Sequence, residues 1–431
     1  MYRALLKAGT GVALVRLAGM AAGFALTMVL ARMLGPEGVG AYGYVVMLLV
    51  LIAVPISSGW ATVLLRATAR AGRDTDGAWS EVSGLMRCGI CLALGLALVW
   101  FALGFFAQGF IGLTVLGVGT LALLAVILFV DQTSALRLAV LRGLDYPVWG
   151  QIPEMLIRPI LILLFFLLFT TLRSGVPELV DAILALGAAA TLAALAGWGV
   201  MWFKSPAALR NARPETYLCP WLRSAALLSG NAGLVILNSQ TDFLMLGFLG
   251  TTEELGHYRV AMQIALLSGF VYIALNMIAI QRFAHLLSTG ETEALQRIAT
   301  FLARLAFLGA LPLLLVFWGW GEVILLYFFG PGFEASHAPL LWLLGSQVLN
   351  AAMGFTHSVL LMGGYEGHLL RFTVLSVVLN ILLCLVLIPR FGLVGAGLAS
   401  FLAQGAWNLV LFSRVFQLIG IDSSILGTLK K

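Results

Sequence analysis

The chain has 431 residues, of which 61% are hydrophobic and only 10% are charged. Soluble globular proteins have roughly 45–50% apolar and about 25% charged residues, so this composition excludes a water-soluble enzyme. The net charge of +6 is modest, and the basic residues lie between apolar runs rather than in one patch, which argues against nucleic acid as a partner.

Apolar runs of spanning length recur from one end of the chain to the other. About 20 such residues in a helix cross a hydrocarbon core of about 30 Å. We therefore predict an all-α polytopic membrane protein with twelve transmembrane helices, at residues 11–33, 41–65, 84–106, 113–136, 155–172, 179–203, 222–249, 257–281, 298–318, 338–362, 369–389 and 393–416.

The basic residues divide unequally between the two ends of these helices. When the loops are assigned alternately to the two sides, one side receives only Arg32, Arg173, Arg259 and Arg390, and the other receives the remaining 21 of the 25 Lys and Arg residues. Cytoplasmic loops carry the excess of Lys and Arg, so both termini are expected in the cytoplasm. An odd number of helices would remove this unequal distribution, so it also favours an even number.

Two similar phrases indicate an internal repeat. Residues 34–42 read LGPEGVGAY, and residues 249–258 read LGTTEELGHY about 215 positions later. A weaker echo pairs Leu141-Arg142-Gly143 with Leu361-Met362-Gly363. We predict two six-helix bundles in the same orientation, a parallel repeat, with domains at 1–204 and 222–431 and a cytoplasmic linker at 205–221. A chance recurrence of glycine-rich turns stays open.

The seventh predicted helix carries a polar stripe. Asn231, Asn238 and Asp242 lie within about 20° of one another on one helical face. Arg259 begins the next helix, and Gln263 lies one turn further on. An ionisable side chain at bilayer depth costs about 2.5–3.5 kcal/mol, so these residues are either a structural Asp242–Arg259 ion pair or the lining of a cavity.

Other polar residues permit similar alternatives. Arg16 lies inside the first predicted helix, where it either extends to the cytoplasmic interface or belongs to a cavity wall with Met20, Gly23 and Thr27. Glu154 and Arg158 are spaced for a structural ion pair, and Asp131 is expected at the interface. Hydrogen bonds between helices are expected for Asn276, Asn350, Asn380 and Asn408.

Motifs of enzymes and metal sites are not found. The chain has no G-x-x-x-x-G-K-[ST], H-E-x-x-H or G-x-S-x-G sequence, and its five histidines are too dispersed to form a metal site by spacing. Four cysteines, Cys88, Cys91, Cys219 and Cys384, are expected as buried unreactive thiols. We therefore predict no catalytic residues, no metal site and no cofactor, and without a nucleotide-binding loop the chain cannot hydrolyse ATP to drive transport.

Three phrases resemble those of the bacterial polysaccharide transporter family. They are ARMLGPEGVGAY at 31–42, DFLMLG at 242–247 leading into GHYRVA at 256–261, and LIPRFGLVGA at 387–396. That family comprises the O-antigen and exopolysaccharide flippases, in the superfamily that also contains the lipid II flippase and the multidrug and toxic compound extrusion transporters. The resemblance extends over nearly the whole chain in order, although each motif is only moderately specific.

The resemblance implies a V-shaped pair of bundles in the cell inner membrane. Such a protein moves an undecaprenyl-pyrophosphate-linked oligosaccharide to the periplasmic leaflet by alternating access, for lipopolysaccharide or exopolysaccharide biosynthesis. Its partners would be this lipid-linked oligosaccharide, the bilayer, and polysaccharide polymerase and chain-length proteins. The cavity of related flippases implies a substrate-binding set of Arg16, Ser57, Ser58, Asn231, Asn238, Asp242, Arg259 and Gln263. Guanidinium groups suit pyrophosphate, and amides and hydroxyls suit sugars.

Two other functions remain open. A cation-coupled multidrug antiporter of the same fold predicts a carboxylate-centred site. The first predicted helix has no carboxylate, although Asp242 alone could serve as a coupling residue. A membrane-embedded glycosyltransferase or ligase normally needs an acidic catalytic cluster and large outer loops, which this sequence lacks.

Overall fold

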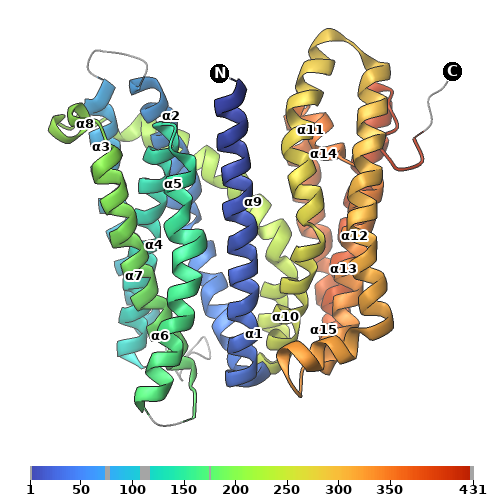
Figure 1. The fold of residues 1–431 in the computed structure, drawn as a ribbon, viewed down its shortest axis with the longest axis horizontal. Helices are drawn as coiled ribbons and strands as arrows, with labels where there is room; N and C mark the ends of the chain where they lie inside the picture. The colour runs from blue at the N-terminus through green and yellow to red at the C-terminus, as the bar shows by residue number, and fades with distance from the viewer. Residues whose placement is uncertain (1, 73–77, 107–116, 174–175, 428–431) are drawn as a thin grey trace. The chain divides into compact units, whose positions relative to one another are not determined.

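The computed structural model describes residues 2–72, 78–106, 117–173 and 176–427. Within these ranges the chain is built of helices joined by short connections, and no β-strand is present (Figure 1). The elements are α1 (Tyr2–Val54), η1 (Pro55–Trp60), α2 (Ala61–Ala71), α3 (Ala78–Phe106), α4 (Val118–Gly143), α5 (Pro147–Ile152), η3 (Pro153–Ile157), α6 (Arg158–Arg173), α7 (Leu179–Lys204), α8 (Ala207–Asn211), α9 (Leu218–Leu249), α10 (Thr252–Ser268), α11 (Phe270–Thr289), α12 (Thr292–Phe329), η4 (Glu334–Ser336), α13 (His337–Met353), α14 (Thr356–Met362) and α15 (Glu366–Ile419).

The predicted fold class, an all-α polytopic membrane protein, is confirmed. Among the described residues, nine helices are long and apolar enough to cross a membrane, or ten when the bent pair α13–α14 counts as one span. Two of the nine, Leu14–Ala71 and Glu366–Ile419, have 58 and 54 residues. Each is long enough for two spans of about 20 residues. The count of twelve and the internal repeat stay predictions.

Glycines interrupt these two long helices where the sequence predicts outer turns. Gly35 has φ 68° and Gly392 has φ 53°, backbone values that favour glycine. Glu254 fixes the second break, because its carboxylate accepts a hydrogen bond from the Leu393 amide at 3.2 Å and another from the Thr251 amide at 2.9 Å. One side chain therefore caps α10 and holds the break in α15.

Two predicted spans are each divided in the structure. The predicted helix 257–281 is split at Gly269, between α10 and α11, and the predicted helix 338–362 is split at Gly354, between α13 and α14. Gly354 has φ 78°. A side chain at this position would also meet the Ser423 carbonyl, so the backbone direction changes where only glycine fits.

The helices group into two compact units. The first contains Met1–Met33 and Val45–Gly233, and the second contains Leu34–Tyr44 and Leu234–Lys431. Segment Leu34–Tyr44 packs within the second unit, because Gly256 lies so close to the Pro36 carbonyl that a side chain there would overlap it. The domain boundaries at 204 and 222 stay a prediction, since this grouping follows contacts rather than the repeat.

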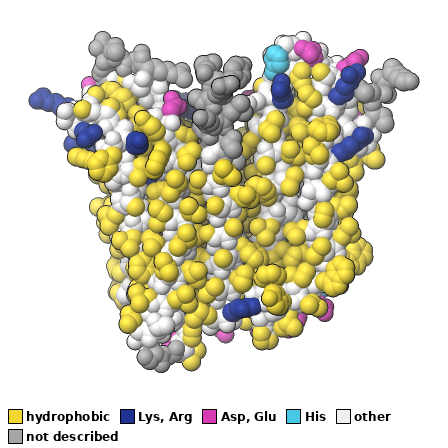
Figure 2. Space-filling view, in the orientation of Figure 1, with side chains coloured by type: hydrophobic (Ala, Val, Ile, Leu, Met, Phe, Trp, Pro, Cys, Tyr) yellow, Lys and Arg dark blue, Asp and Glu magenta, His cyan; other side chains and the backbone are white. Residues whose placement is uncertain are grey.

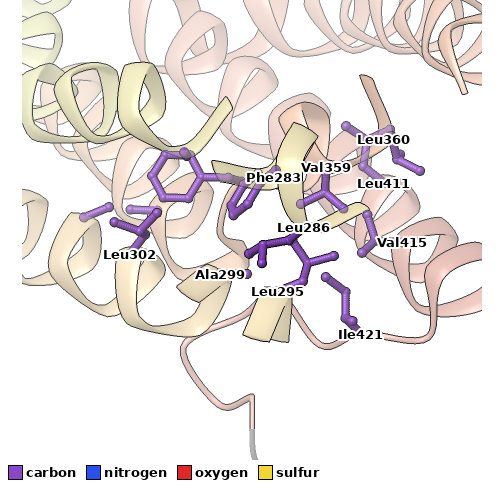
Figure 3. Packing of buried hydrophobic residues seen from close by; sticks show 14 of the residues in the cluster. Phe283, Leu286, Leu295, Ala299, Leu302, Val359, Leu360, Leu411, Val415 and Ile421 are labelled. Carbon is purple, nitrogen blue, oxygen red and sulfur yellow. The ribbon is translucent and has the colours of Figure 1, made fainter. Parts of the chain in front are cut away.

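Each unit has its own apolar core. In the first, Trp60, Leu64, Leu85 and Val140 are almost completely buried, and the indole Nε1 of Trp60 donates a hydrogen bond to the Leu85 carbonyl at 2.9 Å. In the second, helices α11, α12, α14 and α15 meet around buried residues such as Phe283, seen from close by in Figure 3. Because each helix turns its apolar side chains toward these cores, the packing also fixes the direction in which its polar side chains point.

The outer surface is apolar over the middle of the helices. Figure 2 shows hydrophobic side chains there and most Lys, Arg, Asp and Glu side chains near the helix ends. Leu98, Leu195 and Leu308 are each about 60% exposed in the absence of lipid, as expected for side chains that face hydrocarbon. The expectation of buried cysteines is wrong for Cys91 and Cys219, which are exposed; Cys88 is partly buried and Cys384 is buried.

Candidate functional site

A polar pocket lies inside the second unit, between α9, α10, α13 and α15. Its volume is about 320 Å³, and 13 of its 18 lining residues are polar. Five of the pairs that line it are spaced i, i+4, which places both members on one helical face. The pairs are Asn238 and Asp242, Arg259 and Gln263, Ser346 and Asn350, Ser376 and Asn380, and Ser400 and Gln404.

Carboxamides dominate this lining, and most of them are free to bind. The seven are Asn238, Gln240, Gln263, Gln347, Asn350, Asn380 and Gln404. Asn350 is hydrogen-bonded to Tyr272, and Asn380 accepts from the Cys384 thiol at 3.5 Å. In the part of the chain that the structure describes, the other five have no hydrogen-bond partner. Each carboxamide offers donors and an acceptor, which is the complement of a polyhydroxylated ligand.

Asp242 ties three helices together at the wall of the pocket. Its side chain is only 5% exposed. The carboxylate accepts hydrogen bonds from the Tyr258 hydroxyl on α10 and the Ser400 hydroxyl on α15, and Oδ1 accepts from the Phe243 amide at 2.9 Å. These donors stabilise a buried carboxylate that has no cationic partner among the described residues.

Of the two alternatives for Asp242 and Arg259, the structural ion pair is not formed. Among the described residues, Arg259 has no carboxylate within ion-pairing distance. Its guanidinium instead lies 6.0 Å from the centre of the Phe243 ring, a cation–π arrangement. Arg259 is half-buried and lines the same pocket, so beside Asp242 and neutral amides the pocket contains a guanidinium with no ion-pair partner among the described residues.

The other predicted site residues lie in the first unit. Arg16 is half-buried on α1, its Nε has no hydrogen-bond partner in the described part of the chain, and Arg142 lies near enough to repel it. Ser57 and Ser58 lie in the π-helical segment η1. Asn231 is exposed on α9 and does not line the pocket of the second unit.

Ser57 lines a separate cavity of about 230 Å³ in the first unit, beside a network of four charged side chains. The predicted Glu154–Arg158 pair is confirmed, with Nη1 and Oε2 3.6 Å apart. Arg158 also pairs with Asp131 at 2.8 Å, and the fully buried Arg137 pairs with Glu154 at 3.1 Å. Asp131 is thus a member of this network and not simply an interfacial residue.

Sequence reasoning missed the contributions of α13 and α15 to the pocket. Asn350 and Asn380 were expected only to join helices, and Ser346, Gln347, Ser376, Ser400 and Gln404 were not singled out. Their signal in the sequence is the repeated i, i+4 spacing of polar residues within otherwise apolar helices. Among the described residues, no three His, Cys, Asp or Glu side chains lie close enough together to hold a metal ion.

Comparison with known proteins gives one family and one fold. The family model described as "Polysaccharide biosynthesis protein" matches residues 5–280. No curated protein sequence matches the chain significantly.

Solved structures match over nearly the full length. An inward-facing multidrug resistance MATE family transporter of the MOP superfamily has a TM-score of 0.74 at 16% identity, covering 95% of this chain and 98% of its own. The lipid II flippase MurJ in an inward closed conformation has a TM-score of 0.74 at 11% identity, covering 94% and 87%. An outward-facing MATE transporter has a TM-score of 0.66 at 15% identity, covering 96% of each chain. At these identities the likeness establishes the fold.

Proposed function

Since the chain belongs to the polysaccharide biosynthesis protein family, we propose that it moves an undecaprenyl-pyrophosphate-linked oligosaccharide from the cytoplasmic to the periplasmic leaflet of the inner membrane. The family confirms the resemblance that the sequence motifs indicated, and the protein is a multi-pass membrane protein with the fold of the MATE and MurJ structures. Its cargo, the direction of transport and the cytoplasmic location of both termini belong to the proposal.

The observation that supports this cargo is the composition of the pocket in the second unit. Five carboxamides there have no hydrogen-bond partner among the residues that the structure describes, and four serines accompany the seven carboxamides of the lining. An unpaired amide among apolar helices is costly unless a ligand or water occupies it. An oligosaccharide offers many hydroxyls that both donate and accept, so it can satisfy amides that a hydrophobic drug cannot.

Cationic side chains suit the anionic part of this cargo. Arg259, with no carboxylate partner in the described chain, offers a guanidinium to the head group, and a guanidinium donates to two phosphate oxygens at once. Arg16, Ser57, Ser58 and Asn231 of the first unit remain proposed contacts on the basis of the resemblance. The polyprenyl tail can stay in lipid outside the pocket.

A multidrug antiporter is less well supported by the same geometry. An exporter of hydrophobic cations needs a carboxylate that is free to bind the cation. Among the described residues that line this pocket, Asp242 is the one acidic residue, and its carboxylate already accepts hydrogen bonds from Tyr258, Ser400 and the Phe243 amide. A glycosyltransferase or ligase would need several acidic groups in one site, whereas this pocket contains one.

The test replaces pocket amides by an apolar side chain of similar size. Gln263→Met and Gln347→Met remove hydrogen-bonding groups while keeping volume, and Gln417→Met makes the same change at an exposed position near the end of α15. In a strain that lacks the native gene, each of the two pocket variants should lower surface polysaccharide about 5- to 30-fold, since each loses roughly 1–2 kcal/mol of cargo binding. Gln417→Met should export normally.

Membrane levels measured by immunoblot separate loss of transport from loss of protein. Normal export by the Gln263→Met, Gln347→Met double variant would show that the pocket does not receive the cargo.

A further inference from the structure

A second concave site lies in the first unit, where α2 ends, α3 begins and α9 begins. Its volume is about 840 Å³, and its walls include Arg66, Arg70, Glu81, Tyr217 and Trp221. It is a surface groove, separate from the cavity beside Ser57. These residues have no role in the transport proposed above.

The aromatic wall of the groove is held in place by specific contacts. Trp221 is only 5% exposed and meets the ring of Trp60 edge-on, with centroids 6.2 Å apart. Tyr217 meets Trp221 edge-on at 5.9 Å, and its hydroxyl donates to Glu215 Oε2 at 3.0 Å. Because the Glu215 amide in turn donates to the Ser80 carbonyl on α3 at 3.1 Å, the start of α9 is fixed against α3.

Two arginines and one glutamate line the groove, and the Glu215 carboxylate lies beside its Tyr217. Arg66 and Arg70 are both exposed on its wall, and Glu81 faces them. Glu81 lies 3.4 Å from Arg70, which compensates one guanidinium. Arg66 has no carboxylate partner in the part of the chain that the structure describes. Two guanidinium groups thus share one carboxylate, which leaves donors for an anion.

The position of the groove suits a lipid head group. Its side chains come from both edges of the 66–83 loop and from the end of the 204–221 connection, two regions that the distribution of basic residues assigns to the cytoplasm. Tyr and Trp side chains are enriched at the level of lipid head groups, and Arg residues beside the cytoplasmic leaflet attract anionic lipids.

We propose that this groove binds the phosphate head group of a lipid in the cytoplasmic leaflet. Arg66 and Arg70 donate hydrogen bonds to the phosphate oxygens. Tyr217 and Trp221 provide an apolar wall for the carbon atoms next to the phosphate. This phosphate chemistry is shared by the pyrophosphate of a polyprenyl-linked cargo and by anionic phospholipids. The assignment to cargo rests on the proposed function, and the assignment to the cytoplasmic leaflet rests on the topology proposed with it.

The groove is tested by native mass spectrometry of the full chain in a maltoside detergent, which carries no phosphate. The probes are undecaprenyl pyrophosphate and phosphatidylglycerol, titrated separately. Arg66→Gln should weaken binding of the preferred probe about tenfold, because it removes charge-assisted hydrogen bonds to the phosphate. Glu81→Gln should strengthen binding, since it frees Arg70. The two substitutions remove side chains of opposite charge from one wall, so they act in opposite directions.

The matched control is Arg297→Gln, which removes another exposed arginine, in the second unit, 3.7 Å from Glu293. It should bind both probes as the wild type does. Wild-type affinities in both Arg66→Gln and Glu81→Gln would overturn the proposal, and so would an equal loss in Arg297→Gln, which would indicate a general effect of net charge. If Arg66→Gln fails to fold, Arg66→Lys together with Glu81→Gln still tests the groove.

Competition between the probes identifies the source of the phosphate. Displacement of phosphatidylglycerol by undecaprenyl pyrophosphate supports the groove as a loading site for cargo, and the reverse order supports it as a phospholipid site. The measurement requires no transport, so its failure differs from failure of the proposed function. If Arg66→Gln exports polysaccharide normally and binds both probes as the wild type does, only the groove proposal is overturned. If the wild-type protein binds the probes but does not move the lipid-linked oligosaccharide across the membrane, only the proposed transport is overturned.

Discussion

Asp242 and Arg259 lie on the wall of one pocket, yet different neighbours stabilise each of them. The buried Asp242 carboxylate depends on the hydroxyls of Tyr258 and Ser400, while Arg259 lies beside the Phe243 ring. Tyr258 and Arg259 are adjacent on α10, about 100° apart around the helix, so only one of them can point at Asp242. The rotation of α10 about its axis points Tyr258, and not Arg259, at Asp242.

Double-mutant cycles on thermal stability in detergent should separate these two relations. Asp242→Asn and Tyr258→Phe should couple by about 1–2 kcal/mol, because the two side chains share a buried hydrogen bond. Asp242→Asn and Arg259→Gln should be additive within about 0.5 kcal/mol. A strong coupling of Asp242 to Arg259 would restore the ion pair that the sequence spacing indicated.

Part of the site could be predicted from single residues. Asn238, Asp242, Arg259 and Gln263, which the cavity-lining alternative grouped, lie around one pocket, whereas Asn231 of the same predicted stripe does not. The partner of Asp242 could not be predicted, because spacing along one helix does not fix the rotation of its neighbour. The residues of α13 and α15 that line the pocket were not predicted, because each polar residue there is common in a membrane helix and only their i, i+4 pairing is informative.

At the scale of helices, apolar runs predicted some elements within a few residues and missed the ends of others, such as α12 (Thr292–Phe329), predicted at 298–318. The predicted helix 179–203 is α7, Leu179–Lys204, and the predicted helix 222–249 is α9, Leu218–Leu249. The breaks at Gly269 and Gly354 were not predicted, because both lie within continuous apolar sequence. A glycine inside such a run is compatible with an unbroken helix, and tertiary contacts decide where it bends.

Close helix packing leaves no room for a side chain at Gly19 of α1. A Cβ on Gly19 would lie 2.7 Å from the Met155 carbonyl in η3, whereas a Cβ on the exposed Gly95 of α3 would meet no atom within 4 Å. Gly19→Ala should therefore destabilise the protein by about 1–3 kcal/mol through overpacking. Gly95→Ala should stabilise it by about 0.5–1 kcal/mol, since alanine favours a helix more than glycine does.

Thermal unfolding of the two variants in the same detergent compares them directly. Equal changes in both would mean that α1 does not pack against η3 as closely as this structure indicates.

At the scale of the whole molecule, the distribution of basic residues predicts the topology. Reporters fused after residues 73, 210 and 290 should be cytoplasmic, and reporters fused after 110, 252 and 334 should be periplasmic, because 21 of 25 Lys and Arg residues lie on the side assigned to the cytoplasm. Paired alkaline phosphatase and fluorescent protein fusions measure this. One inverted pair of adjacent reporters would remove a helix from the predicted twelve and with it the two-bundle repeat.

Transport itself is tested most directly with the purified chain in liposomes. The cargo is the lipid-linked oligosaccharide that accumulates in a strain lacking the gene, and a membrane-impermeant glycosidase reports which leaflet carries it. With wild-type protein, oligosaccharide from the inner leaflet should become accessible to the enzyme, and the Gln263→Met, Gln347→Met variant should slow this at least about tenfold. Accessibility equal to that of protein-free liposomes would contradict the proposal that this chain is a flippase for lipid-linked oligosaccharides.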